Sequence, residues 1–404
     1  MTHPPPAISN SGGWASNAMR PLPEIQLLPC LPEYARLVAQ GWDSVQESYA
    51  LQPTPEFVER LEQAQAEAQA FDENSGVAEF EIDGEKFKIH AHGVKRYRWR
   101  VENDDFIILI AKTSLDWAIS VRYLAAGLWE YGWQPLRERV WQLLCPHIIQ
   151  CKKDCARVTR ADWCFDFYAP SFAQEIAPGI AANVVAHSSV KKIETQTIGI
   201  GDRSQTLTIG SRASLQIQLY DKTREITEQS GKTWLYPIWI AALDGEWPWD
   251  ERPEGVWRLE IRFFKEFLKN RNCCHPHEVQ LARDHLIAEA LHRWRLVIPQ
   301  TGDQHRQRWP LHPLWSEAYR QRGAPEMLPL GRKITGRRNE LAGQVLKQII
   351  GTARSATVLQ FGNYNGARAK ALLRRAADRI EEDPRHPQKV EAARVRYSDI
   401  DEAR

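Results

Sequence analysis

The segment QTLTIGSRASLQIQLYDKTRE, residues 205–225, alternates apolar and polar side chains on either side of a short turn. This period of two is typical of half-buried β-strands. The stretch between the two runs, residues 210–214, opens with a glycine and supplies the turn, so the segment predicts a β-hairpin. The apolar positions of its strands are Leu207, Ile209, Leu215, Ile217 and Leu219.

Tyr220 closes the second predicted strand, on the same face as Gln216 and Gln218 and opposite the apolar residues. Its phenol is therefore expected to point away from the core. Lys222 follows two residues later and should share that face, where a cation can lower the pKa of a phenol or hold a phosphate oxygen. Tyr220 is thus a candidate nucleophile.

Two further segments with a period of two carry carboxylates. RVTRADWCFDFYAP, residues 157–170, places Asp162 and Asp166 on one polar face, and VWRLEIRFFKEF, residues 256–267, places Glu260 on another. If the three segments are neighbours in one sheet, these acids and Tyr220 converge. Carboxylates without histidine or cysteine are the ligands that suit Mg²⁺ or Mn²⁺, and such an ion serves phosphate chemistry.

The order of these motifs resembles the Rep_trans family, the replication initiation factors of rolling-circle plasmids and some phages, which are related to a class of conjugative relaxases. The motifs are R-x-D-x-x-x-D, T-L-x-I-G-S-R-x-S followed by Y-D-K-x-x-E, and R-x-E-x-R-F. The resemblance covers roughly residues 80–320. It implies a metal-dependent endonuclease that nicks one strand of a replication origin through a tyrosine, stays linked to the 5′ phosphate and leaves a free 3′-OH primer.

Carried onto this sequence, the resemblance makes Tyr220 the nucleophile. It implies a cluster of Asp162, Asp166 and Glu260 that binds Mg²⁺ or Mn²⁺. The same resemblance implies phosphate contacts from Arg160, Lys222 and Arg258. The expected partners are double-stranded origin DNA and single-stranded DNA. Because no G-x-x-x-x-G-K-[ST] loop occurs in the chain, unwinding would fall to a host helicase, and synthesis to a host polymerase.

The composition bounds these expectations. The 404 residues are long for one domain, and their formal charge of +2 does not itself indicate a nucleic-acid binder, so DNA affinity must come from local basic patches. Sixteen tryptophans serve core packing or stack on unpaired bases. No run is long and apolar enough for a membrane span, and no signal segment opens the chain, which predicts a cytoplasmic protein with reduced cysteines.

The expected fold is α+β, with a mainly antiparallel central sheet that carries the active site, packed with helices and extended by C-terminal helices. Residues 1–53 are expected to be a flexible, proline-rich tail and residues 54–75 an N-terminal helix. Residues 76–325 would form the catalytic domain. Residues 326–404 would form a basic helical region with a disordered end, in which residues 339–350 and 366–380 are the expected helices.

Basic residues outside the motifs are candidates for DNA binding. The run at residues 95–100 alternates basic and aromatic side chains, which predicts either a strand that touches a phosphate backbone or a solvated edge strand. The C-terminal region is expected to recognise the origin, to form a homodimer, or to be an ordinary solvated helix pair. The candidates are Lys95, Arg96, Arg98, Arg100, Arg212, Arg332, Lys333, Arg337 and Arg338.

Three alternatives stay open at this point. His90 and His92 form a His-hydrophobe-His pair, whose nickases hold metal through the two histidines and take a tyrosine from a helix, here Tyr364 with Lys370. A second alternative is an origin-binding protein without catalysis. Zinc is a third, through Cys145, Cys151, Cys155 and Cys164, or through Cys273, Cys274, His275 and His277, although neither set has the regular spacing of structural sites.

Overall fold

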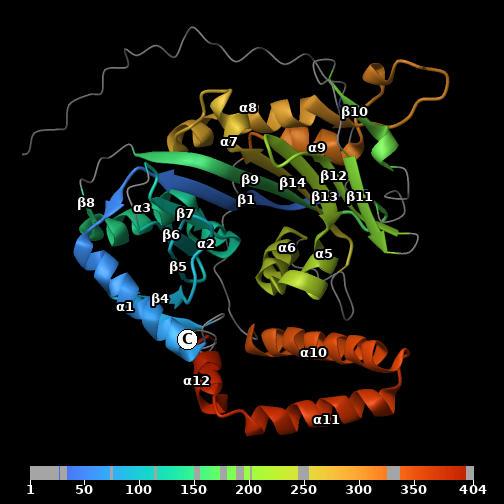
Figure 1. The fold of residues 1–404 in the computed structure, drawn as a ribbon. Helices are drawn as coiled ribbons and strands as arrows, with labels where there is room; N and C mark the ends of the chain where they lie inside the picture. The colour runs from blue at the N-terminus through green and yellow to red at the C-terminus, as the bar shows by residue number, and fades with distance from the viewer. Residues whose placement is uncertain are drawn as a thin grey trace, which may run out of the picture.

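The computed structural model describes residues 27, 34–72, 76–112, 116–149, 155–172, 180–187, 195–200, 203–243, 254–324 and 337–396. Among these residues an 11-stranded sheet dominates, in the order β11-β12-β13-β14-β9-β1-β7-β6-β5-β4-β3 (Figure 1). Every neighbouring pair of strands is antiparallel. Because helices pack on the sheet and others extend the C-terminal end, the predicted α+β class is confirmed.

The strands of this sheet are β1 (Arg36–Tyr49), β3 (Val77–Ile82), β4 (Glu85–His90), β5 (Trp99–Glu102), β6 (Phe106–Ile110), β7 (Ile119–Tyr123), β9 (Ala156–Tyr168), β11 (Thr195–Ile200), β12 (Arg203–Gly210), β13 (Leu215–Asp221) and β14 (Val256–Phe264). The short strands β2 (Gln52–Pro53) and β8 (Ile148–Ile149) pair with each other, as do β10 (Val184–Ala186) and β15 (Trp294–Leu296).

The helices are α1 (Pro55–Phe71), α2 (Ala125–Tyr131), α3 (Trp133–Leu144), α5 (Lys222–Glu225), α6 (Tyr236–Ala242), α7 (Lys265–Lys269), α8 (Pro276–Arg293), α9 (Pro313–Gln321), α10 (Arg337–Phe361), α11 (Gly366–Glu382) and α12 (His386–Arg396). Helices α7, α8 and α9 cover one face of the sheet, whereas α5 and α6 lie on the other (Figure 1). No helix of the described ranges is long and apolar enough to cross a membrane.

The central strand β1 corrects the expected N-terminal tail. Residues 36–49 lie between β7 and β9, in the middle of the sheet, so the boundary expected at residue 53 is wrong. Its pairing with β9 shifts register at three irregularities, one of them between Trp42 and Ser44. Each irregularity interrupts the alternation of apolar and polar side chains along β1. The sequence of residues 36–49 therefore lacks the period of two that would have predicted a strand.

The predicted hairpin of residues 205–220 is present as β12 and β13, with Ile209 facing Ile217 across the pair. Gly210 ends β12 with a φ of 83°, a conformation that favours glycine. A Cβ at this position would also collide with the Trp294 ring. The glycine of the T-L-x-I-G-S-R motif is therefore required both by the turn and by the packing against β15.

The two faces of β9 and β14 differ as their sequences predict. Trp163 and Phe165 of β9 and Ile261 of β14 are buried under the helical layer that contains α8, whose Arg283 places its guanidinium carbon 4.8 Å from the centre of the Trp163 rings. The alternate positions carry the acids and arginines. We call this second side the polar face.

At the C-terminal end, α10 and α11 lie side by side and α12 lies near α1 and β3 (Figure 1). Residues 386–396 form a helix, although the sequence favoured disorder for the last twenty or so residues. The expected helices at 339–350 and 366–380 lie within α10 and α11.

Candidate functional site

The three motif strands are direct neighbours in the sheet, in the order β13, β14, β9. Tyr220 faces Arg258, which in turn faces Asp166. Two residues along β14, Glu260 lies opposite Gln218 on one side and Cys164 on the other. The predicted side-by-side placement of the motifs is thus present, and all their polar side chains emerge on one face.

Tyr220 is half-buried on the polar face, and its hydroxyl donates a hydrogen bond to Glu260 Oε2 at 3.0 Å. Burial and the nearby Glu260 carboxylate raise the pKa of the Tyr220 phenol well above its ordinary value. The phenol therefore keeps its proton unless a base takes it, and Glu260 already accepts the hydrogen bond.

The Y-D-K-x-x-E motif has a local structural explanation. Asp221 caps α5, accepting from the Arg224 backbone N–H at 2.9 Å. Lys222 is buried, and its ammonium lies 2.5 Å from Glu225 Oε2. The same ammonium sits 5.7 Å from the centre of the Tyr220 ring. Lys222 is therefore a cation beside the tyrosine, as expected, but it is not exposed to a phosphate.

Two acids, Asp166 and the partly buried Asp43, hold the buried Arg258. The Arg258 guanidinium donates to both oxygens of Asp166, at 2.6 and 2.8 Å, and to Asp43 Oδ1 at 2.5 Å. Trp239 of α6 donates its indole N–H to Asp166 Oδ2 at 3.0 Å. We call Asp43, Asp166 and Arg258 the buried cluster. Because Arg258 is 0% exposed and bound on three sides, it cannot make the expected phosphate contact in this structure.

An open cluster lies further along the same face, formed by Asp162, Glu260, Arg160 and Arg262. Arg160 donates to both oxygens of Asp162, at 2.9 and 2.5 Å. Arg262 donates to Glu260 Oε1 at 2.7 Å. Burial and the like charge of Glu260 raise the pKa of Asp162 to about 7. Although burial opposes it, the Arg262 guanidinium lowers the pKa of Glu260.

The expected cluster of three metal-binding acids is not formed. Within the described ranges, no group of three histidine, cysteine, aspartate or glutamate residues could hold a metal ion. Asp166 is excluded because the guanidinium that binds both its oxygens, from Arg258, is fully buried, whereas the arginines that bind Asp162 and Glu260 are partly exposed and can turn away. Glu260 lies close enough to Asp162 to raise the pKa of the Asp162 carboxyl. Two carboxylates together with substrate phosphates are a common set of ligands for Mg²⁺. These two acids fit the expected ion, and Asp166 does not.

The basic residues predicted to bind DNA are dispersed. Residues 95–96 form a turn closed by the bridge between Val94 and Tyr97, with a φ of 55° at Lys95, and β5 begins only at Trp99, so the expected alternation of faces is wrong before that residue. Arg96 and Arg98 are exposed, and Arg100 lies 2.6 Å from Glu102. Arg212 is exposed in the β12–β13 turn. Arg332 and Lys333 lie outside the described residues, and Arg337 and Arg338 begin α10.

The geometry does not favour the His-hydrophobe-His alternative. His90 ends β4 with Nε2 2.7 Å from Glu102 Oε1, in the half of the sheet far from Tyr220. Tyr364 is exposed in the connection between α10 and α11, and not on a helix as this alternative requires. Lys370 lies within α11.

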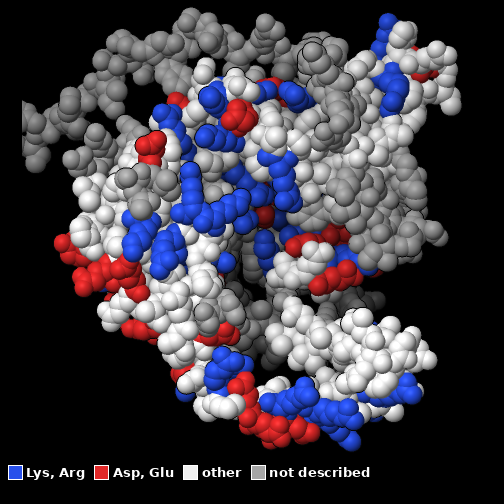
Figure 2. Space-filling model, in the orientation of Figure 1, with Lys and Arg blue, Asp and Glu red and all other residues white. Residues whose placement is uncertain are grey.

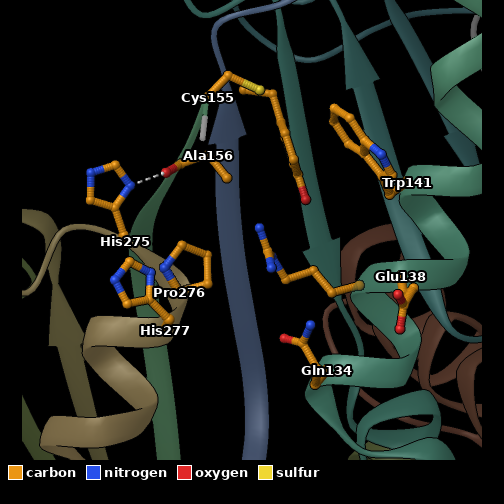
Figure 3. A pocket seen from close by; sticks show the side chains of 10 residues that line it. Gln134, Glu138, Trp141, Cys155, Ala156, His275, Pro276 and His277 are labelled. Atoms are coloured by element: carbon orange, nitrogen blue, oxygen red, sulfur yellow. Dashed lines mark hydrogen bonds between the residues drawn. The ribbon is translucent and has the colours of Figure 1, made fainter. Parts of the chain in front are cut away.

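A pocket of about 260 Å³ opens on the face of the sheet opposite to the polar face, between α3 and the start of α8 (Figure 3). Cys155 and His275, which belong to the two proposed zinc sets, both line it, and His275 Nδ1 lies 3.1 Å from the Ala156 carbonyl oxygen. Arg137 donates to buried Glu47 Oε2 at 2.9 Å. Cys151 lies outside the described residues. The pocket shares no residue with the polar face around Tyr220.

Three residues at the polar face, Asp43, Arg122 and Trp239, are not predictable from the sequence pattern. Asp43 sits at an irregularity of β1, Trp239 arrives from α6, and Arg122 comes from β7. None lies within a motif, and none has a spacing that links it to one. Figure 2 shows Lys and Arg side chains gathered in a band across the part of the molecule where β1, β7 and β9 lie.

No model of a protein family matches the chain. No curated protein matches it. Among solved structures, the chain is similar to the rolling circle replication initiator protein from Geobacillus stearothermophilus, at 15% sequence identity and a TM-score of 0.40. The match covers 72% of this chain and 99% of that one. A likeness at this level assigns no activity to the chain.

Proposed function

We propose that the protein nicks one strand of DNA through Tyr220 and thereby initiates rolling-circle replication. The observation that carries the proposal is the hydrogen bond from the Tyr220 hydroxyl to Glu260, on a sheet face that also carries Arg160 and Arg262. A nucleophile, a base in contact with it and guanidinium groups for phosphate are the parts that a transesterification requires. The sequence motifs around these residues support the same reaction.

In this reaction the Tyr220 oxygen attacks a phosphorus atom and the phenolic proton passes to Glu260 Oε2. The bond from phosphorus to the 3′ oxygen breaks, and that oxygen takes a proton from water. The products are a 5′-phosphotyrosine link and a free 3′-OH primer. Arg160 is 26% exposed and Arg262 is 16% exposed, so both can turn toward a phosphate and offset its developing charge.

The proposed cofactor is Mg²⁺ or Mn²⁺, held by Asp162 and Glu260. Both residues offer oxygen ligands, which favour these ions over zinc. When bound, the ion would polarise the scissile phosphate and stabilise its charge. The arginines that now bind Asp162 and Glu260 would then be released toward the DNA backbone.

The partners follow from the reaction. Double-stranded origin DNA and a separated strand are the substrates, and a host helicase and polymerase would extend the primer. For the C-terminal helices we propose a homodimer contact, because α10 and α11 expose large apolar side chains. These include Leu346, Ile349, Ile350, Leu359, Leu373 and Ile380.

The test is Tyr220→Phe, assayed on a supercoiled plasmid that carries the DNA flanking the gene. The variant should lose nicking and the covalent protein–DNA adduct seen after denaturation, while DNA binding stays within a few-fold. Tyr364→Phe is the matched control and should nick normally. A covalent adduct formed by Tyr220→Phe would disprove the assignment, and the absence of any adduct with the parent protein would favour a non-catalytic origin-binding protein.

A further inference from the structure

Arg122 lies on the polar face although it belongs to none of the motifs. It is a residue of β7 and pairs with Gln46 of β1. Gln46 pairs in turn with Arg160 of β9, and Arg160 pairs with Phe264 of β14. These residues form one row that crosses four neighbouring strands and passes the open cluster.

The Arg122 guanidinium forms no ion pair with an acid of the described residues. It is exposed, and its Nε donates to Ser44 Oγ at 3.1 Å. In the part of the chain that the structure describes, no carboxylate oxygen lies within 4.0 Å of it. This distinguishes Arg122 from Arg160 and Arg262, each of which is paired with an acid.

The surroundings of Arg122 favour an anion. Burial and the nearby Arg160 guanidinium lower the pKa of Arg122, although the carboxylates of Asp162 and Asp43 act in the opposite direction, so Arg122 and Arg160 repel each other. The open cluster sets the two carboxylates of Asp162 and Glu260 against Arg160 and Arg262, and Arg122 lies beside it as a further cation. A phosphate bound beside Arg122 would relieve that repulsion, and a guanidinium can bind phosphate through two N–H groups at once.

The row places its polar side chains at intervals across the sheet. Neighbouring strands are about 4.8 Å apart, so the backbones at Arg122 and Arg160, with β1 between them, are about 10 Å apart. Gln46, between them, donates to Ser120 Oγ at 3.2 Å and keeps its amide on the same face. The row therefore offers repeated polar contacts across the strands of the sheet.

Phe264 gives the row an aromatic end. It is half-buried on the polar side of β14, and the Arg160 guanidinium carbon lies 5.5 Å from the centre of its ring. An aromatic ring at the edge of a basic row is the arrangement that stacks unpaired bases without regard to sequence. A single strand would be held by phosphate contacts along the row and by stacking at this end.

We propose that Arg122, Gln46, Arg160 and Phe264 form a binding track for single-stranded DNA across β7, β1, β9 and β14, with Arg122 as a phosphate-binding residue. The inference deepens the proposed function, because it names the path of the strand that leads to Tyr220. It assigns to Arg122 and Phe264 a role in binding and none in the chemical step.

The test measures binding of a fluorescein-labelled oligothymidylate by anisotropy over a range of salt concentrations, in the Tyr220→Phe background, where no nicking interferes. Arg122→Gln should weaken binding and reduce the slope of log K against log salt by about 0.7, the value for one lost phosphate contact with a single strand. Phe264→Leu should weaken binding roughly 5- to 150-fold and leave the slope unchanged, because stacking releases no counterions.

Arg320→Gln is the matched control for charge. Arg320 lies on α9, which covers the other face of the sheet, and pairs with Glu317. It should bind like the background protein. If Arg122→Gln keeps the parental affinity and slope, or if Arg320→Gln reduces them equally, the track is disproved.

The experiments can disprove the proposed nicking through Tyr220 and the proposed binding track independently of each other. If Tyr220→Phe still nicks DNA, the assigned chemistry is wrong, yet the salt slopes of Arg122→Gln still decide the track. If Tyr220→Phe abolishes nicking while Arg122→Gln and Phe264→Leu bind normally, the chemistry stands and the track falls. Thermal unfolding of each variant, expected to match the background because Arg122 is exposed and Phe264→Leu keeps an apolar side chain, excludes misfolding as the cause.

Discussion

Asp166 in the buried cluster and Asp162 in the open cluster lie on one strand, share one face and are almost equally buried, with exposures of 0% and 1%. Their arginines differ. Arg258, bound to Asp166, is 0% exposed, whereas Arg160, bound to Asp162, is 26% exposed. Burial of the cation therefore separates an ion pair that holds the sheet together from one that can exchange its partner for a phosphate or a metal ion.

The largest expected effect of this difference is on stability. Asp166→Ala leaves Arg258 in the interior with Asp43 alone, and breaking a buried pair in this way costs about 3–5 kcal/mol of unfolding free energy. Asp162→Ala should cost only about 1–2 kcal/mol, because Arg160 can turn to water. Urea denaturation measures both. Equal losses in the two variants would show that the exposure of the arginine does not separate the clusters.

The sequence predicted β9 and β14, which carry most residues of the two clusters, but neither β1 nor the difference between the clusters. Alternation along β9 and β14 placed the acids on the polar face correctly. The partners that distinguish Asp166 lie far from it in the sequence. Trp239 of α6 donates to Asp166 directly, and Asp43, at an irregularity of β1, binds the same Arg258 that binds Asp166. An irregular strand hides its period, and a contact between distant elements leaves no local spacing, so neither partner could be found from the sequence.

A second expected effect concerns cleavage. Asp162→Ala should lower nicking at limiting Mn²⁺ at least about 10–100-fold, because losing one of two carboxylate ligands weakens both the affinity and the placement of the ion. DNA binding should persist, since the change removes negative charge near a phosphate. A Mn²⁺ titration of nicking measures the effect, with His90→Ala and His92→Ala as controls.

The His-hydrophobe-His alternative predicts the opposite pattern, in which the two histidine variants stop cleavage and Asp162→Ala has little effect. Full activity of the parent protein in EDTA would contradict both alternatives, because each requires a bound ion.

The smallest expected effect is the dependence of stability on pH. The pKa of Asp162 is raised from 3.8 to about 7 by burial and by Glu260, so between these values the unfolded chain loses this proton before the folded one does. The contribution of Asp162 to stability is therefore full below about pH 4 and falls as pH rises toward 7. In the buried cluster, Lys232 and Arg258 overcome burial and hold the pKa of Asp43 far below its ordinary value, so Asp43 adds no slope in this window.

Asp162→Asn should flatten the parental slope by less than the ~1.4 kcal/mol per pH unit of one full proton, because Glu260 titrates together with it. Urea unfolding between pH 4 and 8 without divalent ions measures the slope, and an unchanged slope in Asp162→Asn would show that this acid is ionised throughout and held by Arg160 as firmly as Asp166 is held by Arg258.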